Sequence, residues 1–219
     1  LGIGVGSGAE MALIAKGAPE LAICNAAPSV RFIGIMVPMD SPAKTLDDLK
    51  GRRIGVSSAG SLTNWLALEL ARVKGWGPEG VRVVAIGGAS APVIAAFRTH
   101  VVEADIGPTS LGFDMEAHGQ GRLLASAAEY AGNMSGGTIF ASNALLAAHP
   151  DEVRRFLAAW FETIAWMRAH KDETVRIESA VTGFSPAVMA REYDLVIGMF
   201  SDTGRFDAQT LANLRRSFT

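Results

Sequence analysis

Two loops of small residues, at 6–8 and 57–61, have a composition that could bind a ligand. The first reads G-S-G and the second S-S-A-G-S, and each lies between an expected strand and an expected helix. Free backbone N–H groups and the helix dipole at such a position favour an anionic or polar group, by ~0.3–1 kcal/mol per charge. Serine and glycine are also common where a helix simply begins, so one such loop alone would indicate capping. Two loops on separate pieces of the chain favour a ligand site in a cleft between two lobes.

A glycine pattern at 4–9, G-V-G-S-G-A, matches the dinucleotide-binding fingerprint G-x-G-x-x-A. That fingerprint also requires an acid about 20 residues further on to hold the ribose. Residues 21–30 contain no acid, and a chain with 24 glycines is expected to match by chance. We therefore predict no dinucleotide and no other cofactor.

The sequence offers little for nucleophilic or metal catalysis. It has no G-x-S-x-G elbow, no H-E-x-x-H motif and no Cys/His cluster, so no metal site is expected. Glu103 and Asp105 would face the same way on a strand, which allows paired acid/base work, but such acids more often flank a strand end in solvent. We therefore predict no catalytic residue. The histidines fall at expected helix ends or polar turns: His100, His118, His149 and His170.

Composition excludes several classes of protein. Apolar residues make up 49% of the 219 residues and charged residues 19%, which is incompatible with a disordered chain. The 20 basic and 22 acidic residues give a net charge of −2, which argues against a broad nucleic-acid surface. Cys24 is the only cysteine and cannot form an internal disulfide. Its position in an apolar run predicts that it is a core residue. No apolar run of about 18 residues and no signal-like segment occurs, and the chain starts at Leu1 rather than Met.

Short apolar runs alternate with helical patterns, which favours an α/β fold with mostly parallel strands. Pro38 and Pro42 mark a crossing segment, and Thr45-x-x-Asp48 has the form of a helix N-cap. From Pro150 onward only amphipathic helices are expected. The predicted strands are 1–5, 21–24, 32–37, 53–56, 81–86, 103–107, 121–125 and 138–141. The predicted organisation is a first lobe of 1–42 and 135–219, and a second lobe of 43–134.

Three segments resemble the periplasmic solute-binding proteins of ABC importers. Residues 41–56, S-P-A-K-T-L-D-D-L-K-G-R-R-I-G-V, are similar to the entry into the second lobe of that superfamily. Residues 57–66 look like the small-residue loop and helix of its nitrate/sulfonate/taurine group, which includes binders of thiamine-pyrimidine precursors. Residues 204–218 are similar to the C-terminal helix of the group.

The resemblance implies a two-lobe, type II-like binding-protein fold, with crossings near 37–44 and 135–141. Family members have a further strand and helix before the segment that begins here at Leu1, so the first lobe is expected to lack its N-terminal part. A small-molecule ligand would lie between the lobes, and lobe closure would present it to an ABC permease. Carried over by position, the ligand contacts are Gly6, Ser7, Gly8, Ser57, Ser58, Gly60, Ser61, Thr63, Gly88 and Thr109.

The expected function is binding of a small polar or anionic organic molecule, such as a sulfonate, nitrate, taurine or a pyrimidine precursor. The expected protein is a monomer in the periplasm, or outside the cell on a membrane tether, with no nucleic-acid partner. One alternative is an enzyme of thiamine or menaquinone biosynthesis on the same fold. Another is a ligand-sensing domain fused to a further module.

Overall fold

The computed structural model describes residues 1–5, 13–132 and 134–216, and the chain divides into two compact units. Unit 1 consists of Leu1–Ser29 and Asn133–Thr219, and unit 2 is the continuous segment Val30–Gly132. The sequence predicted that the first segment of lobe 1 ends at residue 42, and the first compact segment of unit 1 ends at Ser29. The reason is that the strand predicted at 32–37 hydrogen-bonds only to strands of unit 2 among the described residues.

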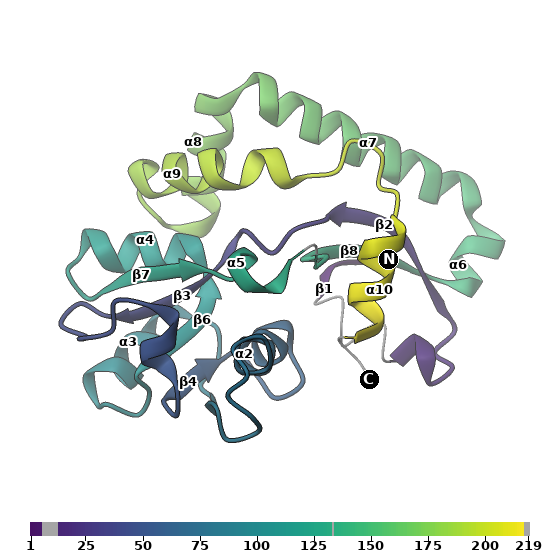
Figure 1. The fold of residues 1–219 in the computed structure, drawn as a ribbon. Coiled ribbons are helices and arrows are strands. Elements are labelled where there is room, and N and C mark those ends of the chain that lie inside the picture. Colours follow the sequence, from purple (N-terminus) through teal and green to yellow (C-terminus); the bar gives the residue numbers. More distant parts are fainter. Residues whose placement is uncertain (6–12, 133, 217–219) are drawn as a thin grey trace. The chain divides into compact units, whose positions relative to one another are not determined.

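Unit 2 is built on a five-stranded sheet with the order β5-β4-β6-β3-β7 (Figure 1). Its strands are β3 (Ile33–Pro38), β4 (Arg53–Val56), β5 (Arg82–Ala85), β6 (Ala104–Pro108) and β7 (Gly121–Ser126). Its helices are the 3-10 turn η1 (Leu46–Leu49), α2 (Leu62–Val73), α3 (Ser90–Arg98), α4 (Thr109–Ala117) and α5 (Ala128–Ala131). Strand β4 runs parallel to β5 and β6, so their carboxyl ends lie at one edge of the sheet.

One face of the unit 2 sheet is covered by α3 and α4. Met36 of β3, which is fully buried, packs in one cluster with Val93 and Phe97 of α3 and with Leu111 and Met115 of α4. The predicted cap before η1 is confirmed, because Oδ2 of Asp48 accepts hydrogen bonds from the backbone N–H and the hydroxyl of Thr45. The backbone N–H of Lys44 also donates to Asp48 Oδ2, and this hydrogen bond, followed by those from Thr45, holds the pKa of Asp48 below its usual value.

Unit 1 contains the antiparallel sheet β1-β8-β2 and a layer of helices (Figure 1). Its strands are β1 (Gly2–Val5), β2 (Glu20–Ala27) and β8 (Gly137–Ser142). Cys24 and Ile139 pack against Phe156 and Trp160, so α7 covers a face of this sheet. Its helices are α6 (Asn143–Ala148), α7 (Pro150–Ala169), α8 (Lys171–Thr182), α9 (Pro186–Val196), the 3-10 turn η2 (Ile197–Met199) and α10 (Ala208–Arg216).

The predicted prevalence of parallel strands is wrong for the described sheets. Only β4 forms parallel pairs, with β5 and β6, whereas β1 and β2 pair with β8, and β3 pairs with β6 and β7, in antiparallel fashion. An apolar strand that is buried on both faces has the same residue pattern in either direction. Strand existence could therefore be predicted here, but strand direction could not.

Candidate functional site

The loop that follows β4 is held by a chain of hydroxyl groups centred on Thr63. Oγ1 of Thr63 accepts a hydrogen bond from the Ser57 backbone N–H at 3.0 Å and lies 3.0 Å from both Ser57 Oγ and Ser61 Oγ. Ser61 Oγ donates to the Ser58 carbonyl at 2.7 Å. Thr63 is only 8% exposed, so this chain of hydrogen bonds fixes the loop from within.

Counting hydrogens assigns the direction of that chain. Each hydroxyl has one hydrogen to donate, and Ser61 uses its own on the Ser58 carbonyl. Thr63 must therefore donate to Ser61, and Ser57 must donate to Thr63. Three of the predicted contacts thus use their hydroxyl hydrogens to shape the loop, and the exposed Ser58 is the serine of this loop whose hydroxyl stays available for a ligand.

Helix α2 starts directly from this loop. Ser61 Oγ accepts from the backbone N–H of Asn64 at 3.2 Å and is the N-cap of α2. Gly60 has φ +74°, a conformation that side chains rarely adopt, and its N–H donates to Asn64 Oδ1 at 3.1 Å. Gly60 and Ser61 therefore have capping and turning roles in the described structure.

The loop that follows β5 meets the loop that follows β4. A Cβ built on Gly88 would lie 3.6 Å from Cβ of Ser57, so the two loops are in van der Waals range. Helix α3 begins here, and its N-cap, Ala89, has no side chain that could accept from the first-turn N–H groups. Pro92 has no N–H, and the N–H groups of Ser90 and Ala91 have no acceptor within the helix, which leaves the donors of these two residues at the N-terminus of α3.

The remaining predicted contacts do not join this cluster in the described structure. Thr109 is fully buried, and its N–H and hydroxyl donate to the carbonyl of Phe32 at 2.9 and 3.2 Å. Its contact with a ligand stays a prediction. Gly6, Ser7 and Gly8 lie outside the described residues.

Asp105 is the residue whose environment the sequence did not predict. It is 2% exposed on β6, and its Oδ1 is buried without a hydrogen-bond partner. Burial raises its pKa from 3.8 to about 7. The expectation that Asp105 would flank a strand end in solvent is wrong. An acid within the apolar run A-D-I-G was the signal that could have indicated burial.

Glu103 is bound by Arg53 and does not share the environment of Asp105. It precedes β6 and accepts hydrogen bonds from the N–H, Nε and Nη2 of Arg53 at 2.8, 3.2 and 2.7 Å. The hydrogen bond from the Arg53 side chain lowers the pKa of Glu103. This ion pair leaves Glu103 without a role in acid/base work shared with Asp105.

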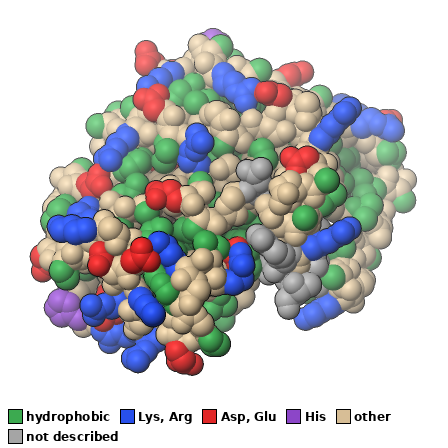
Figure 2. All heavy atoms as spheres, viewed as in Figure 1, with side chains coloured by type: hydrophobic (Ala, Val, Ile, Leu, Met, Phe, Trp, Pro, Cys, Tyr) green, Lys and Arg blue, Asp and Glu red, His purple; other side chains and the backbone are tan. Residues whose placement is uncertain are grey.

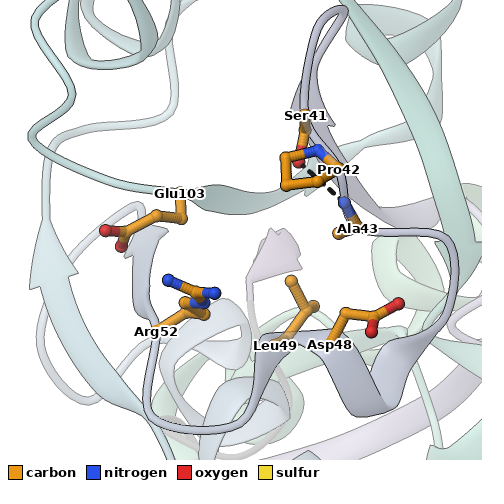
Figure 3. Close-up of a pocket in the computed structure, with 7 residues that line it drawn as sticks. All are labelled: Ser41, Pro42, Ala43, Asp48, Leu49, Arg52 and Glu103. Carbon is orange, nitrogen blue, oxygen red and sulfur yellow. Dashed lines mark hydrogen bonds between the residues drawn. The ribbon is translucent and has the colours of Figure 1, made fainter.

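Glu103 also lines a cavity of about 240 Å³ at the opposite edge of the unit 2 sheet (Figure 3). Arg52 and Glu103 reach into it from beside the amino ends of β4 and β6, and Leu49 forms its apolar part. The cavity is therefore distinct from the loops at the carboxyl ends of the strands.

Charges of both signs are interspersed on the face drawn in Figure 2, without a large patch of one sign. In the described part of the chain, no helix has both the length and the apolar composition that crossing a bilayer requires. The described residues also bring together no group of three His, Cys, Asp or Glu side chains that could hold a metal ion.

Two α/β units, one carrying helix-start loops at the carboxyl edge of a sheet, define the periplasmic-binding-protein fold, and solved structures agree. The chain is similar to the alkanesulfonate-binding protein SsuA of Xanthomonas axonopodis pv. citri, which was solved bound to MOPS. The TM-score is 0.80 at 22% identity, over 97% of this chain and 71% of that one. For the periplasmic aliphatic sulphonate binding protein SsuA of Escherichia coli the TM-score is 0.81 at 21% identity, over 97% and 70%. The desulfurization enzyme DszB shares the fold, with a TM-score of 0.62 at 19% identity over 91% and 71%.

Residues 6–174 match the model of the NMT1/THI5-like family, and the chain belongs to that family. No curated protein matches the chain by sequence. The predicted resemblance to the sulfonate-binding group and the predicted two-lobe fold are thereby confirmed. The fold alone does not decide between binding and catalysis, since DszB is an enzyme.

Proposed function

We propose that this protein is the solute-binding component of an ABC importer and that it binds a small anionic organic molecule of the sulfonate type. Family membership and the likeness to two sulfonate-binding proteins support a solute-binding role. On this proposal the protein works as a monomer in the periplasm, or tethered outside the cell, and delivers its ligand to a membrane permease.

The observation that carries the choice of an anion is the N-terminus of α3. Its first-turn N–H groups have no side-chain cap, and Gly88 brings them beside Ser57 and the loop that starts α2. Two helix N-termini that start from neighbouring loops favour negative charge beside them. Ser58 adds an exposed hydroxyl, and we propose Gly6, Ser7 and Gly8 as further contacts from unit 1.

The test places a carboxylate where the anion is proposed to bind. Ala89→Asp would cap α3, which should stabilise the fold by about 0.5–2 kcal/mol, and the added charge should repel an anion. We expect the Kd for methanesulfonate or taurine, measured by calorimetry, to rise at least about tenfold, which corresponds to ~1.4 kcal/mol.

The matched control is His149→Asp, because His149 is the N-cap of α7 and likewise forms no side-chain cap. It should leave the Kd unchanged. If Ala89→Asp binds the sulfonates as the unmodified protein does, the site is not at α3. If neither sulfonate nor nitrate binds the unmodified protein, the anion-binding proposal is wrong.

An enzyme on the same fold is the second candidate. The observation in its favour is Asp105, whose pKa of about 7 would suit a general acid or base at neutral pH. Asp105 is 2% exposed, however, and its Oδ1 has no hydrogen-bond partner among the described residues, so no hydroxyl, thiol or imidazole is bound to that oxygen. The enzyme candidate requires a bound probe to be converted, so mass spectrometry should recover a changed compound. Binding alone returns the probe intact.

A further inference from the structure

Asp105 combines three features that each destabilise the fold of unit 2. Its carboxyl is almost completely removed from water, and Oδ1 has no hydrogen-bond partner. A Cβ on Gly55 would lie 2.6 Å from that oxygen, and a Cβ on Gly107 would lie 3.0 Å from Oδ2. A side chain at Gly55 would overlap the carboxyl, and one at Gly107 would press closely on it, so both glycines leave room for the carboxyl.

Glycine inside a strand is less stable than alanine, and an unpaired buried polar group adds a further penalty. Residues that weaken a fold and depend on one another are expected at functional sites. Gly55, Gly107 and Asp105 form such a set, because the carboxyl lies in the space that side chains at the two glycines would occupy.

The carboxyl lies on the α3 side of the sheet and leans toward the carboxyl edge. Asp105 pairs with Met36 and with Gly55, and Met36 belongs to the cluster that α3 and α4 cover. Its Oδ2 reaches toward Gly107, two residues nearer the end of β6. Gly55 is two residues before Ser57, so at ~3.3 Å per residue the strand position beside Asp105 lies about 7 Å before the loop that starts α2.

No ion pair among the described residues supplies a neutralising charge to this carboxyl. On β4, Arg53 is paired with Glu103, which precedes β6. On α2, which packs against β6, Glu69 is paired with Arg72. The further titratable residues of the surrounding elements are Arg82 of β5, Arg98 of α3, Asp114 and Glu116 of α4, and Arg122 of β7; β3 has none. Burial raises the pKa of Asp105, because the charged carboxylate loses its contact with water.

We propose that Asp105 takes up a proton when an anion binds at the N-termini of α2 and α3, so that the site selects anions of strong acids and binds them together with one proton. This inference rests on the proposed function. An ionised Asp105 would repel an anion at these helix N-termini across a poorly polarisable interior, whereas the neutral acid does not. A sulfonate is still ionised at every pH at which Asp105 is neutral. It therefore binds as an anion under the conditions in which Asp105 does not repel it.

The experiment measures methanesulfonate binding to the 219-residue chain by calorimetry at pH 6.0 and pH 8.5. We expect the Kd to be about tenfold higher at pH 8.5, because most Asp105 carboxyls are then ionised before binding. At pH 7 the binding enthalpy should differ between buffers of different ionisation enthalpy, since a proton is taken up from the buffer. Asp105→Asn should bind at both pH values with the affinity of the unmodified protein at pH 6.0.

Asp47→Asn is the control, because Asp47 is an exposed acid of unit 2 that is paired with Lys74. It should keep the pH dependence of the unmodified protein. If Asp105→Asn does not fold, the buffer-dependent enthalpy of the unmodified protein decides the question by itself.

Equal affinity at both pH values, with no proton uptake, would overturn the inference and leave the proposed function standing. Tighter binding of taurine, but not of methanesulfonate, at pH 8.5 would overturn it in favour of an ionised Asp105 that pairs with an ammonium group. If neither probe binds at pH 6.0, the proposed function and the inference fail together.

Discussion

The single carboxyl of Asp105 gives the stability of the protein a predictable dependence on pH. Its pKa is raised from 3.8 to about 7 by burial, so between about pH 4 and pH 7 the folded protein holds a proton that the unfolded chain has released. The free energy of unfolding therefore falls as the pH rises through this window and is level above it. Three pKa units correspond to a loss on the order of 4 kcal/mol.

Asp105→Asn should remove this dependence, because an amide of nearly the same shape does not ionise. We expect the variant to be more stable than the unmodified protein at pH 8, and the difference to shrink steadily toward pH 4. Urea unfolding at pH 4.5, 6 and 8 measures this. Parallel pH profiles for the two proteins would show that Asp105 is not neutral in the folded state.

At the scale of elements, the sequence predicted where most strands and helices occur and which loops join them. The Thr45–Asp48 cap, the small-residue loop before α2 and the helical region after Pro150 are all found. These signals are local, because a cap or a turn depends on a few neighbouring residues. The pairing of β3 with β6 and β7, and the burial of Asp105, depend on strand order, which no local pattern encodes.

The start of α2 shows why the candidate site could be predicted only in part. The types of Ser57, Ser61 and Thr63 indicated a polar loop, but a donor free for a ligand and a donor used within the loop look the same in a sequence. Only the distances assign their hydrogens to one another. The available donors at α3 arise from an alanine at its N-cap, which is a residue without polar atoms in its side chain.

Ser61→Ala tests the structural importance of this loop. The change removes the N-cap of α2, the hydrogen bond to the Ser58 carbonyl and the acceptor of Thr63. We expect a loss of about 2–3 kcal/mol, from a cap of about 1 kcal/mol and a buried hydroxyl left without its acceptor. Ser185→Ala is the matched control, since Ser185 caps α9 through one hydrogen bond, and it should cost about 1 kcal/mol. Equal losses in urea unfolding would contradict the hydroxyl chain.

At the scale of the whole molecule, the two units differ in how the chain builds them. Unit 1 combines residues 1–29 with residues 133–219, and β2 and β8 join these distant segments through their hydrogen bonds. Unit 2 is continuous from Val30 to Gly132 and has its own sheet and its own apolar cluster. Continuity and a separate core are the properties of a segment that can fold by itself.

We therefore predict that a fragment of residues 30–132 folds alone. Its circular dichroism should show helix and strand, and urea should unfold it in one cooperative transition. A fragment of residues 30–120 is the control: it lacks β7, which pairs with β3 and packs on α4, so the core cluster around Met36 loses Leu123. That shorter fragment should lose cooperativity. A fragment of residues 30–132 without a cooperative transition would show that unit 2 requires unit 1 to fold. If the fragment of residues 30–132 folds, it can be titrated with sulfonate in the absence of residues 6–8. The binding free energy of the fragment then gives the contribution of the α2 and α3 loops and Asp105 without that of unit 1.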